Sequence, residues 1–370
     1  MSDDSPFPQT PHVTADGGAS AQGTDSPDRA RDPRRRQPED LILAIKEYAD
    51  KLARDGSPRG DLKILSRTLR ELRYAFKVFA GFRHRRKVTV FGSARTSPEA
   101  LAYRQAVRFG QMMAQRDWMV ITGAASGIME AGHRGAGRAH AMGVNIMLPF
   151  EQTPNPVIAG DVKLVHMKYF FTRKLMFVKE SDAVVCLPGG FGTLDEALEV
   201  LTLLQTGKRD MIPVVLLDAP GGCYWRALQQ FIREHLLHNH MISHQDLHLY
   251  RITDSCEEAV QEILQFYRNF HSMRYVRNNL VLRLKTGLDA GVLAEINQAF
   301  SDILAGGQFR QTAALPAEKD DAQLSDLPRL VFRFNRRDHG RLRQLINFLN
   351  RPGPAAEPPG SASGSHPIGG

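Results

Sequence analysis

Short apolar runs alternate with helical stretches between residues 87 and 217, and this alternation constrains the fold more than any other feature of the chain. The runs lie at 87–91, 118–122, 144–148, 162–166, 183–187 and, as the last expected strand, 213–217. Helical stretches are expected at 98–116, from about Ser126, at 170–180 and at 193–205. Apolar strands joined by helices indicate a parallel sheet that is covered on both faces. Because such crossovers are right-handed, we predict a Rossmann-like, doubly wound α/β fold that binds ligands at the carboxyl ends of its strands.

The stretch before this region reads as helical. Residues 40–52 and 61–82 have apolar side chains at helical spacing. In the second stretch a single stripe contains Leu62, Leu65, Leu69, Leu72, Phe76 and Phe79. We expect both helices to cover either the main domain or a partner subunit.

The stretch after the α/β region changes pattern again. Strands are expected at 280–284, 309–315 and 330–334, and helices at 290–304 and 338–350. This β-α-β-β-α order suits a small ferredoxin-like or regulatory α+β module. Both chain ends are rich in Pro, Gly and Ser and are expected to be disordered. The predicted divisions are therefore a tail (1–38), a helical segment (39–86), the Rossmann-like domain (87–270), the α+β module (271–351) and a second tail (352–370).

Composition narrows the class of protein. The 42% hydrophobic content allows a sizeable core, and no apolar run approaches the roughly 20 residues of a membrane span. The polar N-terminus lacks a signal-peptide core, and three cysteines form neither a disulfide framework nor a zinc pattern. We therefore expect a cytoplasmic protein without a membrane partner. The net charge of +8 permits binding of phosphates, but no recognition motif accompanies it, so specific nucleic-acid binding is not expected.

Three glycine-containing turns follow strands of the predicted sheet. They are Gly92-Ser93-Ala94-Arg95, Gly123-Ala124-Ala125-Ser126-Gly127 and Pro188-Gly189-Gly190-Phe191-Gly192-Thr193. Because each follows the carboxyl end of a strand, all three should meet at one edge of the sheet. Glycine lets the backbone approach a ligand closely, and the start of the next helix offers N–H groups that suit a phosphate.

The run from Pro188 to Glu196 is the most specific of these features, and it has two interpretations. Thr193 and Glu196 have the spacing of a capping box, with Thr193 as the N-cap residue. Alternatively, Glu196 points into the mouth of a pocket and holds ribose hydroxyls or water. The pair Arg173-Lys174 also has two interpretations, because adjacent charged residues occur on solvated helix faces as well as in binding sites.

The motif Pro-Gly-Gly-x-Gly-Thr-x-x-Glu at 188–196 resembles the signature of the LONELY GUY (LOG) family, nucleoside 5'-monophosphate phosphoribohydrolases that are often misnamed lysine decarboxylases. The stretches 90–95, 121–130, 170–174 and 199–202 match in the family's order, so the resemblance covers about residues 87–240. It implies that Arg173 and Glu196 are catalytic. It also implies substrate contacts from the phosphate loop Gly189, Gly190, Phe191, Gly192 and Thr193, and from Lys174, Thr202 and Glu151. To these we add Gly92, Ser93, Gly123, Ser126 and Gly127 of the other two turns.

One departure concerns the second turn, where the family commonly has a glycine run. Ala124 and Ala125 stand there in this chain and are expected to narrow the approach to the loop. The flanking helices and the α+β module also exceed the minimal family domain.

The chemistry implied by the resemblance suits these residues. Cleavage of an N-glycosidic bond passes through a cationic, oxocarbenium-like ribose, which the carboxylate of Glu196 would stabilise. The permanent charge of Arg173 would hold the phosphate or polarise the leaving base. His133, His140 and His166 lack metal or catalytic spacing and are interpreted as structural or surface residues.

The sequence therefore predicts a hydrolase without metal or cofactor that acts on an AMP-like or cytokinin-type monophosphate. It should release free base and ribose 5-phosphate, and the resemblance implies a homodimer or larger oligomer. A non-catalytic nucleotide or molybdenum-cofactor carrier of the same fold remains the alternative.

Overall fold

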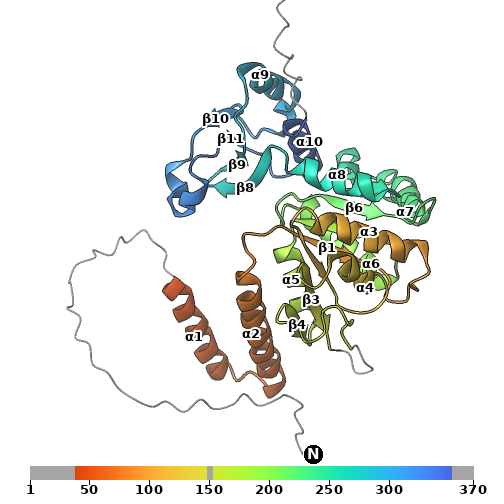
Figure 1. Cartoon of the computed structure of the whole chain (residues 1–370). Coiled ribbons are helices and arrows are strands. Elements are labelled where there is room, and N and C mark those ends of the chain that lie inside the picture. Colours follow the sequence, from red (N-terminus) through yellow and green to blue (C-terminus); the bar gives the residue numbers. More distant parts are fainter. Residues whose placement is uncertain (1–37, 148–152, 352–370) are drawn as a thin grey trace, which may run out of the picture. The chain divides into compact units, whose positions relative to one another are not determined.

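The computed structural model describes residues 38–147 and 153–351 (Figure 1). Both predicted tails lie outside these residues, except for Pro38, and so does Glu151. The chain divides into two compact units between Leu62 and Lys63. Among the described helices none is both long and apolar enough to cross a membrane.

The two N-terminal helices are observed as α1 (Pro38–Arg54) and α2 (Arg59–Ala80). Helix α2 begins in the first unit and continues into the second. Its buried residues are Glu71, Ala75 and Phe79, whereas Leu65 and Leu69 of the predicted stripe are 46% and 54% exposed. Phe79 of the stripe therefore packs in the core, while its exposed leucines leave a partner subunit as the other surface that the stripe was expected to cover.

The predicted Rossmann-like fold is confirmed by a seven-stranded sheet whose pairs are all parallel. Its strands are β1 (Lys87–Phe91), β2 (Met119–Thr122), β3 (Ala141–Ile146), β4 (Leu164–Met167), β5 (Ala183–Cys186), β6 (Val214–Leu217) and β7 (Arg251–Thr253). They lie in the order β4-β3-β2-β1-β5-β6-β7. The prediction that 213–217 is the last strand is wrong, because β7 adds a parallel edge strand beside β6.

The helices of this layer connect or flank the strands. They are α3 (Leu101–Ala114), α4 (Ile128–Ala136), α5 (Phe170–Glu180), α6 (Phe191–Gln205), α7 (Tyr224–Phe231) and α8 (Cys256–Phe266). The strand order reverses between β1 and β5, which are neighbours in the sheet but lie far apart in sequence. Such a reversal is where doubly wound sheets bind ligands.

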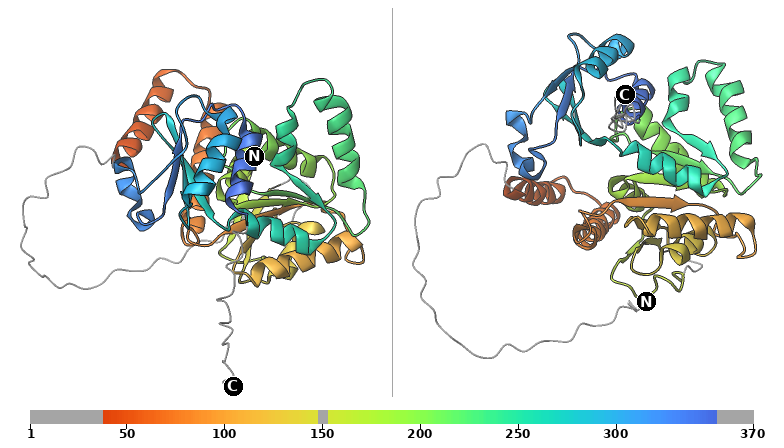
Figure 2. Two further views of the ribbon diagram at one scale, coloured as in Figure 1. Left: turned by 90° about the horizontal axis from the view of Figure 1, so that it is seen from above. Right: turned by 45° about the horizontal axis from the view of Figure 1, so that its top comes forward.

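A second, four-stranded antiparallel sheet belongs to the C-terminal part of the chain, which has the blue end of the colour scale in Figure 2. Its strands are β8 (Phe270–Val276), β9 (Asn279–Leu284), β10 (Arg310–Thr312) and β11 (Arg329–Phe332), in the order β10-β11-β9-β8. The helices of this part are α9 (Ala290–Ala299), between β9 and β10, and α10 (His339–Leu349), after β11. The predicted β-α-β-β-α order is observed from β9 to α10. Strand β8 was missed, because only two of its seven residues are buried and it lacks a clear alternation.

The three histidines have structural or surface positions, as expected. His133 is fully buried, and its Nε2 lies 2.9 Å from the carbonyl oxygen of Met142 and 3.1 Å from the hydroxyl of Thr122. Burial lowers the pKa of His133 to about 4, so its ring is neutral at neutral pH. His140 lies 3.5 Å from Asp117, and His166 is exposed on β4.

Candidate active site

The three glycine turns meet at one edge of the parallel sheet, as predicted. The backbone N–H of Ser93 donates to the carbonyl oxygen of Pro188 at 3.2 Å, which joins the turns after β1 and β5. Ser126 Oγ, in the turn after β2, donates to the carbonyl oxygen of Ala94 at 2.9 Å and joins this turn to the turn after β1. At Gly127, φ is +64° and a Cβ would lie 2.3 Å from the Ser93 carbonyl oxygen, so this position requires glycine.

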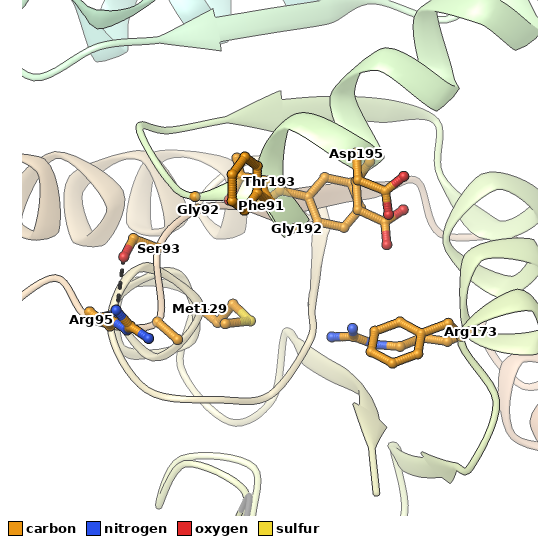
Figure 3. A pocket seen from close by; sticks show the side chains of 14 residues that line it. Phe91, Gly92, Ser93, Arg95, Met129, Arg173, Gly192, Thr193 and Asp195 are labelled. Carbon is orange, nitrogen blue, oxygen red and sulfur yellow. Dashed lines mark hydrogen bonds between the residues drawn. The ribbon is translucent and has the colours of Figure 1, made fainter. Parts of the chain in front are cut away.

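A cavity of about 610 Å³ opens at this junction, which is a size suited to a small-molecule ligand (Figure 3). Its lining combines the turn after β1, the starts of α5 and α6, and Met129 of α4. The lining residues are Phe91, Gly92, Ser93, Ala94, Arg95, Met129, Phe170, Arg173, Gly190, Phe191, Gly192, Thr193, Asp195 and Glu196. Both expected catalytic residues and four of the five phosphate-loop residues are therefore brought together.

The first turn of α6 enters this cavity. The helix begins at Phe191 with Gly190 as its N-cap residue, which supplies no side-chain cap. The capping-box interpretation is therefore wrong, because Thr193 lies inside the helix and Glu196 a turn further on. Helix starts leave backbone N–H groups without an intrahelical partner, so this end of α6 can accept a phosphate.

The phosphate loop, residues 189–193, is held in place by close packing and by a hydrogen bond from α7. A Cβ on Gly189 would lie 2.2 Å from Thr193 Oγ1, which shows how tightly the loop packs. Tyr224 at the start of α7 donates from its hydroxyl to the carbonyl oxygen of Gly189 at 2.6 Å. Sequence reasoning missed this contact, because nothing in the local pattern links Tyr224 to a loop 35 residues earlier.

Glu196 is a buried carboxylate at the cavity wall, with 6% of its surface exposed. Burial raises its pKa above the ordinary glutamate value, while the charges of Lys174 and Arg173 act in the opposite direction. The ammonium of Lys174 lies 3.5 Å from Glu196 Oε2. A carboxylate with a raised pKa beside two cations can stabilise a developing positive charge or accept a proton.

Lys174 does not line the cavity, contrary to its expected role in substrate contact. Its ammonium is paired with Glu199 at 2.6 Å and Asp195 at 2.9 Å, in addition to Glu196. Carboxylates raise the pKa of Lys174 against the effect of burial. The solvated-face interpretation is wrong as well, since this side chain is only 18% exposed and holds three acidic side chains together.

Arg173 points into the cavity toward Met129 (Figure 3). Its Nε donates to the carbonyl oxygen of Val144 at 2.9 Å, and its guanidinium lies 5.1 Å from the ring centre of Phe177. Burial lowers its pKa, although arginine stays charged at neutral pH. A Cβ on Gly123 would lie 2.1 Å from Nη2 of Arg173, so Gly123 acts by leaving room for the guanidinium.

Several residues expected to contact the substrate do not line the cavity, namely Gly123, Ser126, Gly127, Gly189 and Thr202. Thr202 is exposed on α6 and lines a separate hollow with Leu198 and Tyr250, about two turns beyond the cavity. Ala124 and Ala125 are buried and do not line the cavity, so they do not narrow it as expected. Ala124 packs instead with Ala141, Ile158 and Leu164.

The cavity also contains residues that sequence reasoning did not single out. Arg95 is exposed at the mouth, and Phe170 offers an exposed aromatic ring there beside that of Phe191, which was expected. Asp195 and Arg95 both belong to stretches that match the family motifs, and this was the available signal. Met129 and Phe170 also lie in matching stretches, 121–130 and 170–174, but the motifs do not indicate which of their side chains face the cavity.

Comparison with known proteins finds one family model and several relatives that match part of the chain. A family model described as "Possible lysine decarboxylase" matches residues 121–263. A cytokinin riboside 5'-monophosphate phosphoribohydrolase of Arabidopsis thaliana is 36% identical over 154 residues, which are 40% of this chain and 67% of that protein. A second such enzyme of Arabidopsis thaliana is 37% identical over 129 residues, which are 34% of this chain and 57% of that protein.

Among solved structures, the molybdenum cofactor carrier protein of Chlamydomonas reinhardtii is 20% identical, with a TM-score of 0.35. That match covers 49% of this chain and 97% of the carrier.

Proposed function

Because this chain belongs to the LOG family of phosphoribohydrolases, we propose that it hydrolyses the N-glycosidic bond of a nucleoside 5'-monophosphate. The observation that carries the proposal is the cavity in which buried Glu196, Arg173 and the start of α6 meet. The products would be a free base and ribose 5-phosphate. AMP-like and cytokinin-type monophosphates are the substrates proposed first.

The phosphate would bind at the first turn of α6. The backbone N–H groups of Phe191 and Gly192 and the hydroxyl of Thr193 can donate to its oxygens, and Arg95 adds positive charge at the mouth. Binding there would orient the ribose toward the wall that contains Glu196. This use of remote binding energy is a general way to raise turnover.

The reaction then needs stabilisation of a cationic ribose. As the bond from C1' to the base nitrogen breaks, the Glu196 carboxylate stabilises the positive charge on the sugar. The electron pair of that bond leaves with the base nitrogen, and a water oxygen bonds to C1'. One proton of the water stays on the new C1' hydroxyl; the other passes to Glu196 and from there to the base nitrogen, so the free base is released protonated and Glu196 returns to its carboxylate form. The guanidinium of Arg173 offers fixed donors to the departing base or to the phosphate.

Incubation with a panel of monophosphates tests this function. We expect free base and ribose 5-phosphate from at least one member of AMP, GMP, CMP, UMP and a cytokinin riboside monophosphate. The matching nucleoside, which lacks the phosphate, should show a kcat/KM lower by about 100-fold or more. Two charge-assisted hydrogen bonds to phosphate are worth about 3–6 kcal/mol, which accounts for a loss of this size. Chromatography of the base and enzymatic assay of the sugar phosphate provide the measurement.

Two outcomes would contradict the proposal. Unchanged nucleotide across the panel, with folded protein and measurable nucleotide binding, would favour the carrier. Equal rates for adenosine and AMP would remove the proposed role of the α6 start.

A homodimer or larger oligomer is proposed as the active assembly. In support, α2 exposes Ile64, Leu65, Leu69 and Phe76, and clustered exposed apolar residues often mark interaction surfaces. Light scattering at micromolar concentration should give at least twice the chain mass of 41.3 kDa. The double variant Leu65→Glu, Leu69→Glu should remain folded, and its measured mass should fall toward that of a single chain. A wild-type monomer at these concentrations would refute the assembly.

A further inference from the structure

We propose that Glu71 on helix α2 is a positioning residue for Arg173, because its carboxylate anchors the first turn of α5. The kinetic part of this inference rests on the proposed hydrolysis. Glu71 lies outside residues 121–263, which the family model matches. The N-terminal helix would therefore contribute to the site as well as to the surface of the molecule.

Both carboxylate oxygens of Glu71 contact the start of α5. Oε1 accepts a hydrogen bond from the backbone N–H of Lys168 at 3.0 Å, and Oε2 accepts one from the hydroxyl of Thr172 at 3.0 Å. Arg67, one turn earlier on α2, donates from Nε to Oε1 at 2.7 Å. Glu71 is 5% exposed, and a buried carboxylate is stable only when paired in this way.

The start of α5 lacks a cap from its own N-cap side chain, that of Tyr169. The first turn of a helix offers free N–H groups and the positive end of the helix dipole, and both favour an anion. The Glu71 carboxylate places a negative charge at this end of α5, held by the Lys168 N–H just before the helix and by the Thr172 hydroxyl in its first turn.

Arg173 lies in the turn that Glu71 holds. It directly follows Thr172, and its backbone N–H donates to the carbonyl oxygen of Tyr169 at 3.3 Å. Its guanidinium is confined by the Val144 carbonyl oxygen and by the backbone of Gly123. A small displacement of this turn would therefore break the Arg173–Val144 bond or move the guanidinium off its target, and catalysis is sensitive to shifts of about 1 Å.

Variants of Glu71 test the inference. Glu71→Ala should lower kcat about tenfold or more, because misplacement of a catalytic group slows the chemical step. KM should change by less than about threefold, since the phosphate site on α6 is untouched. Glu71→Gln should restore most of kcat, because its amide oxygen can accept from Lys168 and its amide nitrogen can donate to the Thr172 hydroxyl. That hydroxyl then donates to the Tyr169 carbonyl oxygen, which is 2.9 Å away.

A second variant follows the contact itself. Thr172→Val replaces the hydroxyl with a methyl group of similar size and should lower kcat less than Glu71→Ala does, since the Lys168 contact remains. The double variant should show no loss beyond that of Glu71→Ala, because both changes remove the same contact. Thr172→Val also tests the inference if Glu71→Ala does not fold.

The matched control is Glu258→Ala. Glu258 also accepts a hydrogen bond from a threonine hydroxyl, that of Thr253 at 2.7 Å, but it belongs to α8 and does not line the cavity. Its kcat should equal that of the wild type. Wild-type kcat in Glu71→Ala, an equal loss in Glu258→Ala, or failure of Glu71→Gln to restore kcat would overturn the inference.

Hydrogen exchange separates this inference from the proposed function. A peptide covering 168–177 should exchange faster in Glu71→Ala than in the wild type and in Glu71→Gln, whatever the enzyme does. Unchanged exchange in Glu71→Ala would show that Glu71 does not anchor this turn. A wild-type protein inactive on every monophosphate would instead overturn the proposed function and leave the anchoring to be decided by exchange.

Discussion

Replacing Glu196 with glutamine is expected to lower kcat about 100-fold or more, which is the scale of a single electrostatic catalytic group. Glutamine keeps the size of the side chain but removes the charge that would stabilise a cationic ribose. Nucleotide affinity should be retained, because a carboxylate near the phosphate has been removed. Single-turnover rates and equilibrium binding of a monophosphate measure the two effects separately.

Glu199→Gln is the matched control for this experiment. Glu199 pairs with the same Lys174, at 2.6 Å, but does not line the cavity. If Glu196 served only as a partner of Lys174, both variants would lower the rate to a similar extent. Near-normal turnover of Glu196→Gln would show that the carboxylate is not catalytic, and it would remove the main reason to prefer an enzyme over a carrier.

Arg173→Lys should lower kcat/KM by about 100-fold, although the positive charge is kept. Lysine lacks the planar fork of donors, so it cannot bond the Val144 carbonyl oxygen through Nε while presenting other donors to the ligand. Steady-state kinetics on the best monophosphate provide the measurement. A fall of less than about threefold would mean that charge alone is required at this position.

Gly123→Ala reaches the same guanidinium from the backbone. Its added methyl group would lie 2.1 Å from Arg173 Nη2, so the end of a flexible side chain must move while the fold remains. We expect a loss of activity in a folded protein. Gly60→Ala serves as control, because its methyl group would meet nothing within 4 Å. Full activity of Gly123→Ala would show that the observed place of the guanidinium is not required.

The location of the site could be predicted because it depends on local patterns. Apolar runs such as 183–187 specify buried strands, and a turn such as Gly189–Thr193 must lie at the carboxyl end of the strand before it. Parallel pairing then brings the turns after β1 and β5 to one edge, whatever the details of packing.

The partners of individual side chains could not be predicted in this way. Lys174 and Arg173 are neighbours in sequence, yet one is held by three carboxylates and the other points into the cavity. Helical rotation of about 100° per residue separates them, and the partners come from α6 and β3. Thr202 was misplaced for a related reason, since its motif spacing does not reveal where the cavity ends along α6.

The sequence by itself determined the α/β architecture, the edge at which a phosphate can bind and the family motif that contains Glu196, because strand polarity and glycine turns act over a few residues. Only the tertiary structure decided that α6 starts at Phe191, that β7 and β8 complete the two sheets, and that Glu71 contacts α5. These features depend on burial and pairing between residues far apart in the chain. Glu71 and Thr172 are 101 positions apart, and no local pattern reports a contact over that distance.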